Sequence, residues 1–109
     1  MGKLLGLDVG EKRIGYAVSD ESLSIAFPRG FLKRESWQQV LKNLQAVIQE
    51  ENISDIIVGL PLNEENEEGK EAKNIRAFAE KIGGTLGLPV DFIDEHGTTK
   101  EALAKIPTR

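Results

Sequence analysis

A short apolar run in the second half of the chain places the strongest limit on the fold. The hydrophobic segment from Ile56 to Leu60 follows Asp55 and ends at Pro61. A run of this length, apolar at every position, is typical of a central strand that is covered on both faces. Such strands occur mainly in parallel sheets whose crossover connections are helices. The run therefore predicts an α/β architecture.

The rest of the chain divides into segments with strand or helix periodicity. Strands are predicted over residues 3–8, 13–19, 28–33, 55–60 and 89–94. Capping boxes begin at Ser36 and Thr98, and apolar residues at helical spacing predict helices over 36–52, 72–86 and 98–106. Strands joined through helices should be parallel, whereas the first three form an antiparallel meander. We expect a mixed five-stranded sheet with helices on both faces.

Composition limits both the size of the fold and its chemistry. A chain of 109 residues has the size of one domain, and it contains no Cys and a single His. Disulfides, thiolate metal sites and multi-His zinc sites are therefore excluded. His96 is either a proton donor near neutral pH or an exposed turn residue.

Charge and hydropathy bear on partners and location. The net charge of −4 argues against a passive, high-affinity nucleic-acid-binding module, because such modules are usually basic. It argues less against an enzyme whose contact with substrate is brief and bridged by metal ions. With no apolar run of transmembrane length and no signal-peptide layout, we expect a cytoplasmic protein that does not contact membranes.

Three acidic residues end the first and last predicted strands, namely Asp8, Asp94 and Glu95. Because the carboxyl ends of parallel strands lie at one edge of a sheet, the topology should bring these residues together. Carboxylates without neighbouring His or Cys suit Mg²⁺ or Mn²⁺, which in hydrolysis of phosphodiesters activate water and stabilise the leaving oxygen. The alternative is that Asp8 and Asp94 only cap the turns that follow them.

Polar residues beside this edge are candidates for contact with nucleic acid. They are Lys12, Arg13, Asn63, Thr98 and Thr99. Basic side chains in a turn contact backbone phosphates, and hydroxyls at a helix N-terminus bind phosphate. Each residue also has a purely structural interpretation: solvated turn charges for Lys12 and Arg13, a turn residue for Asn63, and a helix cap for Thr98.

Four collinear segments carry a recognisable pattern. They are Leu5-Gly-Leu-Asp-Val-Gly-Glu-Lys-Arg-Ile-Gly15, Ala17-Val-Ser-Asp20, Ile57-Val-Gly-Leu-Pro-Leu-Asn63, and Asp94-Glu95 followed by Thr98-Thr99. Together they resemble the YqgF/RuvX family over nearly the whole chain. The resemblance implies an RNase H-like fold and a metal-dependent nuclease that matures the 5′ end of the 16S rRNA precursor. It also implies that Asp8 and Glu95 are the catalytic acids.

The resemblance leaves the substrate open. Relatives of the family include Holliday junction resolvases, so cleavage of branched DNA by the same chemistry is the alternative. Resolvases of that class generally act as homodimers. The chain departs from the family pattern in having His96 and Gly97 where Arg and Leu are usual, and family members continue past the position of Arg109 into a helix with a further metal-binding Asp. We expect one domain over residues 1–109. Two explanations remain open for the missing helix, namely that the sequence is cut short or that this member has lost the ligand.

Two other classes of function remain open. Sugar kinases and actin-like ATPases share this fold and also begin with an Asp-x-Gly motif, here Asp8-Val-Gly10. Those proteins clamp a nucleotide between two domains, whereas this chain has the length of one. The other class is a non-catalytic interaction protein that keeps the fold with a degraded site. Titration with Mg²⁺ separates it from the enzyme, because only an intact site responds at Asp8 and Glu95.

Overall fold

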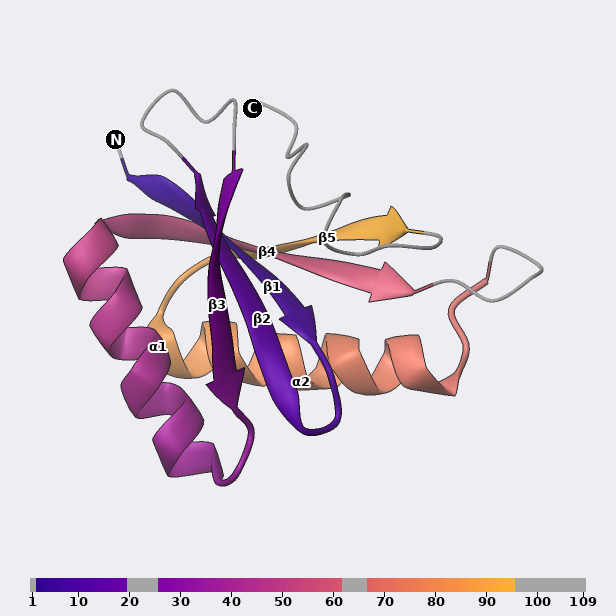
Figure 1. Ribbon diagram of the computed structural model, residues 1–109. Coiled ribbons are helices and arrows are strands. Elements are labelled where there is room, and N and C mark those ends of the chain that lie inside the picture. The colour runs from indigo at the N-terminus through magenta and orange to yellow at the C-terminus, as the bar shows by residue number, and fades with distance from the viewer. Residues whose placement is uncertain (1, 20–25, 62–66, 96–109) are drawn as a thin grey trace.

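The computed structural model describes residues 2–19, 26–61 and 67–95. Within these residues, five strands form one sheet that two helices cover (Figure 1). The elements are β1 (Lys3–Val9), β2 (Arg13–Ser19), β3 (Ala26–Lys33), α1 (Trp37–Glu51), β4 (Ile53–Pro61), α2 (Lys70–Leu86) and β5 (Val90–Glu95). The strand order is β3-β2-β1-β4-β5, antiparallel from β3 to β1 and parallel from β1 to β5. The predicted mixed sheet is confirmed.

Both helices lie on the same face of the sheet (Figure 1). Val40 and Leu44 of α1 belong to the same hydrophobic core as Ala79 and Ile82 of α2. The connections β3–α1–β4 and β4–α2–β5 proceed in the same direction across the sheet, and right-handed crossovers in one direction place their helices on one face. Helices α1 and α2 therefore cover only one face of the sheet, whereas the sequence predicted helices on both faces. The third predicted helix, over 98–106, lies outside the described residues.

Side chains of the central strands alternate between the two faces. Leu5 and Leu7 of β1 are buried in the core beneath the helices. Leu4 lies on the opposite face, hereafter the second face, in a smaller buried cluster with Ala17 and Ile57. Burial of β1 and β4 on both faces explains why their sequences are nearly continuous apolar runs.

The helix ends follow local sequence signals. The Ser36 hydroxyl accepts a hydrogen bond from the Gln39 backbone N–H at 3.1 Å, so the helix start predicted at Ser36 is confirmed. The Gln39 side chain donates to the Asn43 Oδ1 at 3.1 Å instead of completing the capping box. Helix α1 ends at Asn52 and α2 at Gly87, both with left-handed backbone (φ of 54° and 72°). Asn and Gly are the residues that adopt this conformation at the lowest energy. In the described part of the chain, neither helix combines the length and hydropathy that crossing a membrane requires.

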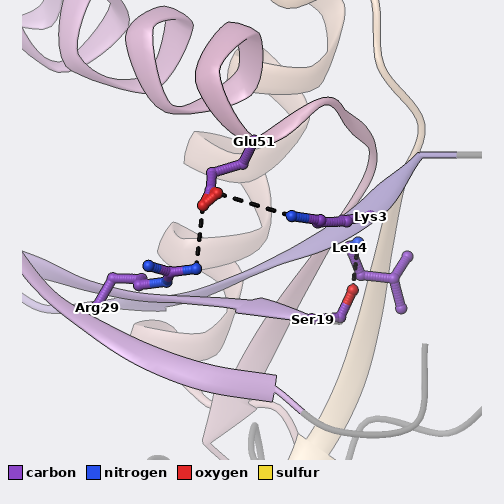
Figure 2. A network of polar contacts seen from close by, with 5 residues as sticks. All are labelled: Lys3, Leu4, Ser19, Arg29 and Glu51. Atoms are coloured by element: carbon purple, nitrogen blue, oxygen red, sulfur yellow. Dashed lines mark hydrogen bonds and ion pairs between the residues drawn. The ribbon is translucent and has the colours of Figure 1, made fainter. Parts of the chain in front are cut away.

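A polar network secures the amino end of β1 (Figure 2). The carboxylate of Glu51, at the end of α1, forms ion pairs with Arg29 at 3.0 Å and Lys3 at 3.9 Å. Beside them, the buried Ser19 hydroxyl accepts a hydrogen bond from the Leu4 backbone N–H at 2.7 Å. This network ties α1 and the first three strands together at the end of β1 that lies away from Asp8.

Candidate active site

Asp8 is the last residue but one of β1, at the carboxyl end of that strand. Its neighbours Leu7 and Val9 are buried beneath the helices, so strand alternation places Asp8 on the second face. The residue is half-buried, and burial raises the pKa of its carboxyl group above the ordinary value. Among the described residues, no hydrogen-bond donor or cation is paired with this carboxylate.

The end of β5 lies two strands from Asp8, across β4. The register pairs Leu60 with Asp94, and Leu60 is buried beneath the helices. Position 94 therefore belongs to the helix face, whereas position 95 belongs to the second face together with Ile93. The side chains of Asp94 and Glu95 are outside the described part of the structure.

The strand register places positions 94 and 95 on opposite faces of the sheet, although the sequence predicted that Asp8, Asp94 and Glu95 lie together. Positions 8 and 95 share one face of the sheet, with β4 between them. Neighbouring strands are about 4.8 Å apart, so β1 and β5 are separated by roughly 10 Å. Position 94 falls on the other face. The remaining predicted residues at this edge lie outside the described residues, and they are Asn63, His96, Thr98 and Thr99.

Lys12 and Arg13, the two basic residues predicted to contact nucleic acid, lie within the described part of the structure, and both are exposed. Lys12 lies in the turn after β1, and Arg13 begins β2. Arg13 pairs with Lys33 of β3 in the antiparallel ladder, which places two like charges opposite each other. Such a pair is unfavourable by itself. Lys12, Arg13 and Lys33 line a recess of about 580 Å³ together with Phe31 and Leu32.

Phe31 lies beside Asp8 and is not among the candidate residues that the sequence predicted. It is 61% exposed and pairs with Gly15, which pairs in turn with Asp8. Because Gly15 has no side chain, Asp8 and Phe31 approach each other over its backbone. A Cβ atom at Gly15 would lie 3.5 Å from the Asp8 Cβ and 3.3 Å from the Phe31 ring. The available signal was the apolar pair Phe31-Leu32, because alternation along a strand buries one member and exposes the other.

The described part of the site provides one candidate metal ligand, Asp8. No group of three or more His, Asp or Glu residues that could hold a metal ion occurs within the described ranges. Asp8 nevertheless fits a divalent cation, because it offers an oxygen donor that is partly desolvated and has no cationic partner in the described part of the chain. Mg²⁺ keeps several waters and needs only one or two carboxylates, so Asp8 with one further acid would suffice.

The chain matches the model of a known protein family and is similar to several proteins of that family. The family model described as "RuvX: Holliday junction resolvase" matches residues 2–109. A relative from Chelativorans sp. (strain BNC1), named "Putative pre-16S rRNA nuclease", is 42% identical over 99 residues, which are 91% of this chain and 62% of that protein. A relative of the same name from Anaeromyxobacter sp. (strain Fw109-5) is 36% identical over 104 residues, 95% of this chain and 76% of that protein. The chain thus spans less than two thirds of the length of the first relative and about three quarters of the length of the second.

Solved structures share the fold at low sequence identity. RuvC from T. thermophilus, solved in complex with a Holliday junction substrate, matches with a TM-score of 0.59 and 17% identity over 86% of this chain and 65% of that one. Pelota from Archaeoglobus fulgidus matches with a TM-score of 0.53 and 13% identity over 93% of this chain and 29% of that one. At these identities only the fold is shared. Since RuvC has the RNase H-like fold, the fold implied by the sequence resemblance is confirmed.

The family match covers all four segments that carried the resemblance, from the β1–β2 hairpin to the residues after β5. The Anaeromyxobacter relative matches over three quarters of its own length. On this evidence, the chain belongs to the RuvX family.

Proposed function

We propose that this protein is a divalent-metal-dependent nuclease that hydrolyses phosphodiester bonds at the 5′ end of the 16S rRNA precursor. The observation that carries the proposal is the environment of Asp8. This carboxylate is partly desolvated at the carboxyl end of a central strand, and the described residues provide it with no cation. Burying a charge is unfavourable unless the group is paired or coordinates a metal. The names of the two relatives support the same activity.

Glu95 is the proposed second ligand. The strand register puts position 95 on the same face as Asp8, two strands away. Asp8 and Glu95 would together hold one divalent ion on that face. The register argues against Asp94 as a further ligand of the same ion, because position 94 belongs to the helix face.

When bound, Mg²⁺ or Mn²⁺ supplies Lewis-acid activation of water and neutralises charge at the scissile phosphate. The chain's own residues fix the geometry. Asp8 and Glu95 would hold the ion, and Lys12 and Arg13 would hold phosphates of the substrate backbone near the β1–β2 turn. Further candidate contacts to the substrate are Asn63, Thr98 and Thr99.

Cleavage of branched DNA by the same residues is the second candidate function. The family model is described as a Holliday junction resolvase, which is the observation that favours it. A homodimer would suit that substrate, because a four-way junction has two equivalent strands to cut. We propose a cytoplasmic location on the basis of the RNA substrate.

A cleavage assay tests the proposed function. The protein is incubated with a 16S rRNA precursor or with a four-way DNA junction, with Mg²⁺, Mn²⁺ or EDTA. We expect metal-dependent cutting by the wild type and loss of cutting in Asp8→Asn and Glu95→Gln. Glu11→Gln is the matched control, because Glu11 is an exposed acid in the next turn and should leave the rate unchanged. Equal rates in wild type and Asp8→Asn would refute the proposal, and the preferred substrate decides between RNA and branched DNA.

A further inference from the structure

Two large hydrophobic side chains are well exposed within the described residues, and both lie on the edge strand β3. Phe27 is 47% exposed and pairs with Val18, which is buried beneath the helices. Phe27 therefore belongs to the helix face. Phe31 is 61% exposed and pairs with Gly15 on the second face, the face of Asp8. Of these two rings, Phe31 is the one placed beside the candidate active site.

Gly15 leaves a gap between the ring and the carboxylate. The Phe31 ring and the Asp8 Cβ both lie within 3.5 Å of the position that a Gly15 Cβ would occupy. The two side chains are therefore separated by less than twice that distance, which is short enough for one nucleotide to contact both.

The Phe31 ring contacts the Arg13 side chain and is still exposed to solvent. The Arg13 guanidinium lies 4.7 Å from the centre of the Phe31 ring, within the range of a cation–π contact. Phe31 keeps its high exposure despite this contact. A ring that is fixed on a strand and backed by Arg has the features of a surface on which a nucleobase stacks.

The charges around the ring favour a polyanion as its partner. Lys12, Arg13 and Lys33 line the recess that contains Phe31, and Arg13 and Lys33 are opposite each other in the ladder. In a protein of net charge −4, this gathering of basic groups beside an exposed aromatic ring favours a nucleic acid over a second acidic chain.

We propose that Phe31 is a stacking platform for an unpaired base of the substrate strand, and that it positions a neighbouring phosphate at Asp8. The proposal rests on the proposed nuclease function and deepens it. Bases in a continuous duplex are stacked on one another and do not present a free face to the ring. The substrate class is therefore a strand with at least one unpaired nucleotide beside the cleavage point. Phe31 is a positioning residue, since its ring holds the base while the chemistry takes place at Asp8.

Binding without cleavage tests the platform separately from catalysis. A fluorescein-labelled single-stranded RNA, its DNA counterpart and the duplex of each are titrated with the full chain in EDTA, and fluorescence anisotropy gives Kd. We expect tighter binding of single strands than of duplexes. Phe31→Leu, which keeps an apolar side chain and removes the aromatic face, should weaken single-strand binding about 5- to 100-fold. Phe31→Trp should restore it, and Phe27→Leu is the matched control that should leave it unchanged.

The outcomes distinguish this inference from the proposed function. Unchanged single-strand binding in Phe31→Leu, or an equal loss in Phe27→Leu, would overturn the stacking platform even if the wild type cleaves RNA. A change in oligomeric state in Phe31→Leu with unchanged oligonucleotide binding would also overturn it, because the ring would then contact a second copy. Conversely, Phe31-dependent binding by a protein that cleaves no substrate would support the platform and refute the nuclease.

Discussion

Two adjacent glycines near the end of α2 should respond in opposite directions to the same substitution. Gly83 is buried, and a Cβ atom there would lie 2.5 Å from the Val90 Cγ2 and 3.0 Å from the Leu88 carbonyl oxygen. Gly84 is exposed, and a Cβ atom there would meet nothing within 4 Å. Gly83 thus allows the end of α2 to pack closely on the start of β5, the strand that leads to Glu95.

The magnitude follows from two opposing effects. Replacing Gly by Ala inside a helix stabilises it by about 0.5–1 kcal/mol, because the Gly backbone loses more conformational entropy on folding. At Gly84 this is the whole effect, so Gly84→Ala should be stabilising by that amount. At Gly83 the added methyl group meets a stiff β-branched side chain and a backbone atom, and overpacking of this kind costs about 1–3 kcal/mol. Gly83→Ala should therefore be destabilising by about 1–2 kcal/mol net.

Urea denaturation followed by circular dichroism measures both free energies of unfolding. A difference of about 1.5–3 kcal/mol between the two variants is expected, with wild type between them. If Gly83→Ala proves as stable as Gly84→Ala, the close packing of α2 on β5 and the reasoning from it are refuted.

Three further predictions concern single residues. Burial raises the folded-state pKa of Asp8, so its ionised form destabilises the metal-free fold. Asp8→Asn should therefore be more stable than wild type at neutral pH in EDTA. Urea titrations should show this difference in stability disappear as the pH falls toward the ordinary pKa of 3.8. Ser19→Ala leaves the buried Leu4 N–H without its acceptor and should lower the free energy of unfolding by about 1–3 kcal/mol in the same assay, whereas an unchanged value would exclude that role for the hydroxyl. Arg13→Ala should reduce the slope of log Kd against log salt by about one for single-stranded RNA, and an unaltered slope would argue against a phosphate contact.

Much of the fold could be predicted because its signals are local. The capping box at Ser36, the alternation in Arg13–Ser19 and the apolar run ending at Pro61 each indicate an element without reference to the rest of the chain. The sequence predicted helices on both faces without assigning each helix to a face, so the placement of α1 and α2 on one face was not predicted. It depends on the direction in which the crossovers traverse the sheet, and that direction is fixed only by the strand order.

The site was less predictable because it depends on pairing across strands. That Gly15 lies between Asp8 and Phe31 follows from two registers, one of which has an irregularity between Tyr16 and Ala17 that no sequence pattern reveals.

The carboxylate of Glu68, in the segment between β4 and α2, accepts hydrogen bonds from Arg76 at 2.7 and 3.1 Å. This contact lowers the pKa of Glu68. The guanidinium of Arg76 also lies over the Phe92 ring. Partners eight residues apart on a loop and a helix cannot be recognised from spacing alone.

The central claim is that Asp8 and Glu95 bind one divalent ion on the second face. Paramagnetic broadening of backbone amide signals during titration with Mn²⁺ tests it most directly. We predict that the signals of Asp8, Glu95 and Gly59, which lies on the strand between them, broaden together at the lowest Mn²⁺ concentrations. Either Asp8→Asn or Glu95→Gln should abolish the broadening at all three positions. Broadening at Asp8 that persists unchanged in Glu95→Gln, or that never reaches Glu95 in the wild type, would contradict a shared ion.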